Sequence, residues 1–137
     1  GILATIPSKE YRVIVSPDKD FESVPCNLVS LQKDIDSITG KPVIRKISKE
    51  LADFKFFKQA LTGDTVDNYK GCPKYGIKTA EKVLTANGAN WSTVLKCYLK
   101  AGLTEQEALT QARCARILRL EDYDMQKKEI RLWTPKN

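Results

Sequence analysis

The stretch GDTVDNYKGCPKYGIKTAEKVL, residues 63–84, constrains the fold most, because it ends one helical pattern and begins another. Before it, Ser48 is a good helix N-cap, and the pattern of KELADFKFFKQALTG predicts a helix that ends at Gly63. One face of this helix is expected to carry Leu51, Phe54, Phe57 and Leu61. A second helix is expected near Ile77, with inward residues Ala80, Val83 and Leu84. The sequence therefore predicts two helices joined by a charged, glycine-containing turn.

The predicted turn combines two carboxylates with glycines and lysines. Asp64 and Asp67 are three residues apart, so on a helical backbone both carboxylates would project from one face, about 5–6 Å apart. Gly71 and Gly76 flank CPKY, and glycines there let the backbone approach a phosphate, which the N–H groups of a helix start can bind. The lysines around this point are Lys74, Lys78 and Lys82. Two interpretations stay open: a metal site beside a phosphate-binding turn, or a helix end followed by a solvated loop.

Residues 11–47 predict a small α/β arrangement. YRVIVS is a short β-branched run typical of a buried strand, while CNLVSL and KPVIRKI predict a hairpin of two further strands with Gly40 in its turn. The turn PDKDF places Asp18 and Asp20 just past the end of the first strand, where open α/β sheets bind ligands. An ordinary Asp-rich turn is the simpler alternative, because aspartate is common in turns.

The C-terminal half is predicted to be mainly helical. WSTVLKCYLKAG has a helical pattern, and TEQEALTQARCARILRLEDY opens with Thr104 and Glu107 in capping-box spacing. Along the latter helix, an arginine recurs at every third residue: Arg113, Arg116 and Arg119. Two interpretations of this repeat stay open: a solvated face or a nucleic-acid contact. KEIRLWTP predicts a short extended piece whose Trp133 packs back on the body. We therefore expect an α/β part in residues 1–47 and a helical part in residues 48–137.

Composition narrows the chemistry that this chain can perform. The 137 residues include no histidine, which excludes Ser–His and Cys–His catalysis, and four widely spaced cysteines that favour reduced cytosolic thiols over structural zinc. No apolar run approaches the roughly 20 residues of a membrane helix. The net charge of +6 raises the expectation of nucleic-acid binding. Chemistry must rest on carboxylates, lysines or a hard metal ion.

The two aspartate pairs together supply the carboxylates of a two-metal phosphodiesterase site. Mg²⁺ and Mn²⁺ prefer oxygen ligands, and aspartates from separate segments suit them. Two such ions stabilise the attacking and leaving oxygens of an in-line displacement at phosphorus. We expect the pairs Asp18/Asp20 and Asp64/Asp67 to converge on one cleft, although 44 positions separate Asp20 from Asp64.

Three of these motifs resemble one known family. GDTVDNYKGCPKYGIKTAEKVL is similar to the helix–three-turn–helix segment of the 5′-nucleases, the flap endonuclease and 5′-3′ exonuclease superfamily. VIVSPDKDF resembles the strand and paired-aspartate turn of that family, and GLTEQEALTQARCARILRLEDYDMQKKEIRLW resembles the C-terminal tail of the bacteriophage exonucleases. The resemblance runs from about Gly1 to Trp133. It implies an α/β fold, in which the C-terminal part of a PIN-like nuclease core precedes a mainly helical part with the helix–three-turn–helix motif.

The resemblance also implies a site and a reaction. The catalytic metal ligands would be Asp18, Asp20, Asp64 and Asp67. Duplex DNA would contact the hairpin through Gly71, Lys74, Gly76, Lys78, Thr79 and Lys82, with a potassium ion on main-chain carbonyls within Tyr69–Gly76. The implied reaction is Mg²⁺- or Mn²⁺-dependent hydrolysis of DNA phosphodiesters near 5′ ends or flaps. Lys74 and Tyr75 depart from the family pattern, since many relatives have glycine and isoleucine there.

The resemblance further implies that other family residues lie upstream of Gly1, because GILATIP resembles the tail of a helix that follows an acidic cluster. We expect the chain alone to be a weak or inactive nuclease that retains DNA affinity, with a missing N-terminal half as its partner and no membrane contact. Two alternatives stay open: a non-catalytic helix-hairpin DNA-binding module, and one half of a split nuclease. A phage-encoded protein of this kind would act in the cytoplasm of the bacterial host.

Overall fold

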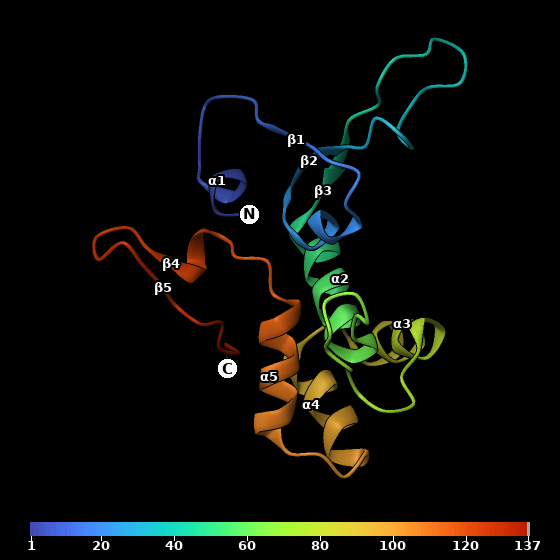
Figure 1. Ribbon diagram of the computed structural model, residues 1–137, viewed down its shortest axis with the longest axis vertical. Coiled ribbons are helices and arrows are strands. Elements are labelled where there is room, and N and C mark those ends of the chain that lie inside the picture. Colours follow the sequence, from blue (N-terminus) through green and yellow to red (C-terminus); the bar gives the residue numbers. More distant parts are fainter. Residues whose placement is uncertain (137) are drawn as a thin grey trace. The chain divides into compact units, whose positions relative to one another are not determined.

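The computed structural model describes residues 1–136 and shows a mixed α/β chain of helices and small sheets (Figure 1). The chain divides into two compact units. The first combines Gly1–Ala52 with Ile117–Arg131, and the second combines Asp53–Arg116 with the segment from Leu132. Residues 117–131 belong to the first unit, whereas the sequence-based division at residue 47 assigns them to the helical part. Within residues 1–136, no helix is both long and apolar enough to cross a membrane.

The first unit contains the three strands that the β-branched runs predict. β1 (Val13–Val15) pairs in parallel with β2 (Cys26–Val29), and β2 pairs antiparallel with β3 (Arg45–Ile47). α1 (Ile2–Thr5) precedes β1, and the 3-10 helix η1 (Lys19–Ser23) connects β1 to β2. The aspartate turn therefore lies past the end of β1, as the sequence predicts.

The connection from β2 to β3 is a polar hairpin held by aspartates. The Asp34 carboxylate accepts a hydrogen bond from the Ser30 N–H at 2.7 Å and pairs with the Arg45 guanidinium at 2.9 Å. These contacts, the backbone hydrogen bond first, hold the pKa of Asp34 below its ordinary value. Gly40 has a φ of 65° in the turn, which confirms the left-handed residue predicted there.

The apolar core of the first unit is small. Its cluster of buried residues consists of Leu28, Ile47 and Ala52, with Ile14, Phe21 and Cys26 packed against them. Ile14 and Leu28 are register partners, so they project from the same face of the sheet.

The segment 117–131 completes the first unit. It contains the 3-10 helix η2 (Leu120–Asp122) and a two-stranded hairpin of β4 (Tyr123–Asp124) and β5 (Glu129–Ile130). The Leu120 N–H donates to the Thr5 hydroxyl oxygen at 2.7 Å. This bond joins positions 115 residues apart in the chain.

The predicted arginine stripe is wrong, because it requires one helix from Thr104 to beyond Arg119. α5 (Glu105–Ala115) ends earlier, and Arg119 is 3% exposed in the first unit. The Arg119 guanidinium donates to the Ser23 carbonyl at 2.8 Å. In the second unit, the Arg116 guanidinium lies 5.2 Å from the centroid of a core aromatic ring. The three arginines therefore share no face.

The second unit is helical. It contains α2 (Lys49–Thr62), whose first turn belongs to the first unit, α3 (Ile77–Asn87), α4 (Trp91–Lys100) and α5 (Figure 1). The predicted caps are confirmed: the Ser48 hydroxyl accepts from the Leu51 N–H at 3.1 Å, and Thr104 forms its capping box with Glu107. Local capping chemistry therefore sets the starts of α2 and α5.

An extensive apolar core fills the second unit. Its fully buried large side chains are Phe56, Leu61, Leu84, Val94 and Tyr98. The Tyr98 hydroxyl donates to the Ala60 carbonyl at 2.7 Å, which satisfies the polar end of the buried ring. Trp133 packs edge-on against Phe56 and Trp91, with ring centroids 5.0 and 5.5 Å apart, as predicted.

The inward face of α2 matches the predicted face only in part, with Leu61 buried as expected. Leu51 is 40% exposed, whereas Phe56 and Ala60 are buried. Phe54 and Phe57 are only partly buried beside the core. The small Ala60 marks the point of close packing on this helix, and a pattern weighted toward large apolar residues misses it.

Candidate functional site

Backbone hydrogen bonds shape the turn of residues 63–76 between α2 and α3. Asp64 and Tyr69 exchange N–H···O bonds of 2.9 and 3.0 Å, which close a short loop. The Cys72 N–H donates to the Leu61 carbonyl at 2.8 Å and returns the chain to the end of α2. The residues between Asp64 and Tyr69 are exposed, so their side chains project from a hydrogen-bonded base.

Gly63 and Gly71 pack backbone to backbone at the base of this loop. Both have left-handed φ angles, 70° and 68°. A Cβ on Gly71 would lie 2.4 Å from the Gly63 nitrogen, and the Gly71 N–H donates to Oε1 of Gln111 on α5 at 2.7 Å. Close backbone packing within the chain therefore accounts for glycine at position 71, without the approach of a phosphate.

The start of α3 presents glycine and lysine to solvent. Gly76 is the N-cap residue with φ −75°, and a Cβ there would meet no described atom within 4 Å. Lys74, Lys78, Thr79 and Lys82 are exposed, and the three lysine side chains have no ion-pair or hydrogen-bond partner among residues 1–136. An open helix start with unpaired lysines around it is suited to bind a polyanion.

Tyr75 turns inward between these exposed residues. Its hydrogen bond with Cys97 of α4, together with burial, raises the pKa of Tyr75 to about 12. Burial also raises the pKa of the Cys72 thiol to about 11. The inner side of the turn is thus neutral at physiological pH, while its outer side is cationic.

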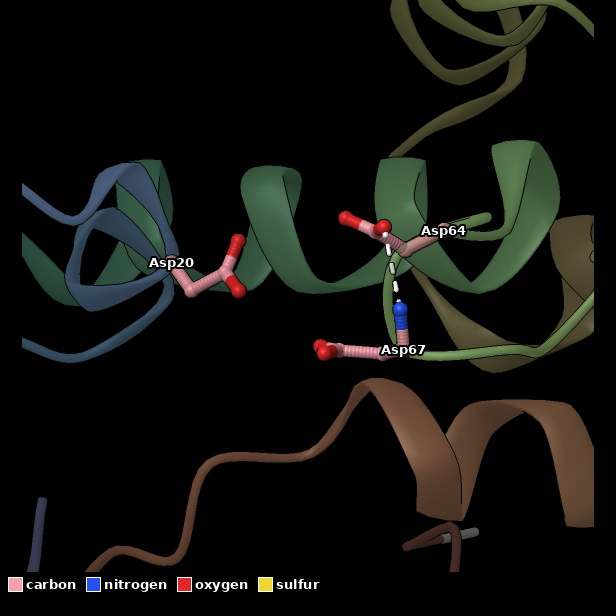
Figure 2. A group of neighbouring side chains, drawn as sticks. All are labelled: Asp20, Asp64 and Asp67. Atoms are coloured by element: carbon pink, nitrogen blue, oxygen red, sulfur yellow. Dashed lines mark hydrogen bonds between the residues drawn. The ribbon is translucent and has the colours of Figure 1, made fainter.

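Asp64 and Asp67 extend their carboxylates in the same direction from the loop (Figure 2). Their ligand oxygens lie within 4.8 Å of each other. Oδ1 of Asp64 accepts from the N–H of Val66 at 2.8 Å and from the N–H of Asp67 at 3.4 Å, the latter drawn as a dashed line in Figure 2. An aspartate turn, not a helical turn, therefore brings the pair together.

Asp18 and Asp20 repeat this arrangement in the first unit. Asp18 is the N-cap of η1, and its Oδ1 accepts from the Asp20 N–H at 2.9 Å. Asp18 is exposed, and Asp20, also drawn in Figure 2, is half-buried. In both pairs, the first aspartate uses one oxygen to hold the backbone of the second. The two pairs belong to different units, and their convergence stays a prediction.

The chemistry of the donor set favours a hard cation. All four candidate ligands are carboxylates, which suit Mg²⁺ or Mn²⁺ better than zinc. Within residues 1–136, no lysine or arginine forms an ion pair with Asp18 or Asp67. The negative charge on Asp67 therefore lies beside that of Asp64 without a cationic side chain bound to it, and a metal ion would relieve this repulsion.

Sequence reasoning missed Gln111 as a support of the turn. This side chain bonds the Gly71 N–H from 40 positions along the chain. A glutamine in an amphipathic helix usually faces solvent, so no local pattern distinguishes it.

Two phage proteins are similar to this chain. An exodeoxyribonuclease of Enterobacteria phage T3 is 32% identical over the whole chain, and an exonuclease of Escherichia phage T7 is 29% identical over 98% of it. The chain spans about half the length of these curated relatives, 54% in each case. No family model matches the chain, and no solved structure matches it significantly.

These similarities are to phage nucleases. More particularly, they confirm the resemblance that the sequence motifs predict, a resemblance to the C-terminal half of the phage exonucleases.

Proposed function

We propose that this chain is part of a divalent-metal-dependent 5′-3′ exonuclease or flap endonuclease that hydrolyses DNA. The observation that carries the proposal is the turn of residues 63–76. On one hydrogen-bonded segment, a carboxylate pair with oxygens within 4.8 Å precedes an open helix start with unpaired lysines. Such a segment can hold a DNA backbone close to a metal-binding group. The names of the phage relatives support DNA as the substrate.

The metal ligands in this proposal are the four aspartates. Asp18 and Asp20 contribute ligands from the first unit, and Asp64 and Asp67 contribute ligands from the second. Asp18 holds the backbone of Asp20 through Oδ1 and keeps Oδ2 for an ion contact of its own. When bound, a pair of Mg²⁺ or Mn²⁺ ions supplies activation of water and charge stabilisation at the phosphate. The residues of the chain fix these ligands and, through the turn, orient the DNA strand.

The turn and α3 form the proposed helix–three-turn–helix site for duplex DNA. Lys74, Lys78, Thr79 and Lys82, with the backbone at Gly76, contact phosphates, so binding carries no base sequence preference. Gly71 serves this site by fixing the turn. A potassium ion would bind main-chain carbonyls within Tyr69–Gly76. In this segment, the carbonyls of Tyr69, Cys72 and Gly76 also accept backbone hydrogen bonds.

The first unit is the proposed docking surface for the remaining half of the nuclease. β1 is an edge strand in parallel pairing, and parallel sheets are normally covered on both faces. Beside this edge, Leu3, Tyr11 and Val15 are 75%, 74% and 62% exposed. The length of the relatives supports a partner of about the same size as this chain.

The test uses a 5′-end-labelled DNA duplex with Mg²⁺. The chain is compared with an Asp64→Asn, Asp67→Asn variant, each with and without the unmatched half of the T3 relative. We expect weak or no hydrolysis by the chain alone, and release of 5′ nucleotides when the other half is added. The double variant should bind the duplex normally and release nothing.

Two results would change the conclusion. If no combination hydrolyses DNA although the duplex binds, the chain is a non-catalytic DNA-binding module. If the unaltered chain alone hydrolyses the duplex efficiently and the double variant does not, these 137 residues suffice and the docking proposal is wrong.

A further inference from the structure

A polar pocket lies in the second unit between the end of α3 and one side of α4. Its volume is about 350 Å³, within the usual range of ligand-binding pockets. Its polar lining includes Tyr75, Asn87, Asn90, Ser92, Lys96 and Lys100. The proposed aspartate metal site uses none of these residues.

The pocket is cationic. Lys96 and Lys100 are exposed, and neither has an ion-pair or hydrogen-bond partner in the part of the chain that the structure describes. No carboxylate is among the lining residues. Because Ser92, Lys96 and Lys100 follow one another at four-residue spacing on α4, they lie on one side of the helix, about 6 Å apart along its axis.

Hydrogen bonds within the chain shape the floor of the pocket. Oδ1 of Asn90 accepts from the Thr93 N–H at 3.0 Å and caps α4. The Thr93 hydroxyl donates to the Asn87 carbonyl at 3.2 Å, which ties the end of α3 to the start of α4. The lysines thus lie beside residues that hydrogen bonds within the chain already hold in place.

One wall of the pocket belongs to the turn that carries the proposed DNA contacts. Tyr75 lines the pocket and directly follows Lys74. Cys97 of α4 lines the same pocket, so the turn borders α4 there. The pocket therefore adjoins the turn that carries Lys74.

We propose that this pocket is a second binding site for the phosphate backbone of duplex DNA, with Lys96 and Lys100 as its charged groups and Ser92 as a hydrogen-bond donor. The inference rests on the proposed function and extends the proposed DNA-binding surface from the turn onto α4. Each DNA strand carries one negative charge per 3.4 Å of helix axis, so lysines about 6 Å apart can each contact a phosphate.

The experiment measures duplex binding by fluorescence anisotropy over a series of salt concentrations. The pocket variant is Lys96→Ala, Lys100→Ala, and its charge-preserving counterpart is Lys96→Arg, Lys100→Arg. A matched control, Lys9→Ala with Lys127→Ala, removes two exposed lysines of the first unit. A Lys74→Ala, Lys78→Ala variant tests the turn in parallel, and the thermal midpoint of each variant verifies folding.

We expect the pocket variant to weaken binding by up to about tenfold, and to flatten the plot of log K against log salt by about 0.9 per lost phosphate contact. The arginine variant and the first-unit control should keep the slope of the parent. In ¹⁵N-labelled protein, the backbone amides of Ser92 and Lys96 should shift when the duplex is added.

A pocket variant with the parent's slope and affinity would overturn the inference. If the turn variant is weakened in the same experiment, only the inference fails; if the parent does not bind duplex at all, the proposed function fails with it. Inorganic phosphate is a separate arm. Shifts at Ser92 and Lys96 with phosphate alone, and none with duplex, would show a small-anion site and contradict the proposal.

Discussion

The helical unit carries eleven basic and six acidic side chains, whereas the first unit carries twelve basic and eleven acidic ones. Nearly all of the net charge of +6 thus belongs to the unit that contains the turn and the α4 pocket. Binding to a phosphate backbone depends on unpaired cationic side chains, so DNA affinity should depend mainly on the second unit. In the proposed function, the first unit, which is nearly neutral, would supply one of the two aspartate pairs.

The two units also differ in how they are stabilised. The core cluster of the second unit has thirteen buried residues and that of the first has three. Of the large apolar side chains that are exposed in residues 1–136, eleven lie in the first unit and four in the second. The second unit is held by apolar burial, while the first depends more on polar contacts and leaves more apolar surface exposed.

The largest expected effect is on the base of the turn. In Gly71→Ala, the new Cβ would clash with the Gly63 backbone at a φ of 68°, and no flexible side chain can move aside to admit it. We expect a loss of about 3 kcal/mol or more in the free energy of unfolding. Urea unfolding followed by circular dichroism measures this loss. A variant as stable as the parent would show that the close Gly63–Gly71 packing is wrong.

The next largest effect on stability is expected for Arg119, which is buried in the first unit. Arg119→Met keeps much of the side-chain volume but removes the donor to the Ser23 carbonyl. An unsatisfied buried acceptor costs about 1–3 kcal/mol. Hydrogen exchange should therefore become faster for the amides of β1 to β3, and stay unchanged for those of α3 and α4. Equal acceleration in both units would contradict their separate stabilisation.

Local signals in the sequence predict much of this fold. The β-branched runs predict β1 to β3, and the cap residues Ser48 and Thr104 predict the starts of α2 and α5. The position of Arg119 could not be predicted, because its partner Ser23 is 96 positions away and no local pattern encodes that contact. The buried face of α2 was predicted only in part: Leu61 is buried as expected, but Phe56 and the small Ala60 were missed.

The candidate site was predictable as a set of residues but not as a geometry. The spacing of Asp64 and Asp67 indicates a carboxylate pair, although a hydrogen-bonded loop holds it in place of a helix. Gly71 and Gly76 look equivalent in sequence. One packs against another backbone and the other faces open space, and only the tertiary structure separates their roles.

A smaller effect should appear in the pH dependence of stability. The pKa of buried Cys72 is raised to about 11, so the folded state keeps the thiol neutral while the unfolded chain ionises above about pH 9. The associated stability is fully present below pH 9 and is lost as the pH rises toward 11, by up to about 1.4 kcal/mol per pH unit. Urea unfolding at pH 8, 9.5 and 10.5 measures this.

The matched comparison is between Cys72→Ala and Cys114→Ala, the second of which alters an exposed thiol. Between pH 8 and 10.5, Cys72→Ala should lose less stability than the parent, and Cys114→Ala should follow the parent. Parallel curves for all three proteins would show that the Cys72 thiol is not buried in solution.

The smallest effect on stability is expected at Gly76, where the comparison between the two glycines of the turn becomes sharpest. Its φ of −75° suits alanine, and a Cβ would meet no described atom within 4 Å. Alanine is a poorer N-cap than glycine but makes the unfolded chain less flexible, so Gly76→Ala should change the free energy of unfolding by no more than about 1 kcal/mol. Its duplex affinity should nevertheless fall several-fold, because the Cβ would stand where a phosphate approaches the N-terminal N–H groups of α3.

Anisotropy titrations of Gly76→Ala, of Lys74→Ala, Lys78→Ala and of the triple variant would show whether both changes act on the same contact. If they do, the triple variant should lose less affinity than the sum of the separate losses. Unchanged affinity in Gly76→Ala would mean that the lysines attract DNA to this surface without the backbone of the turn touching it.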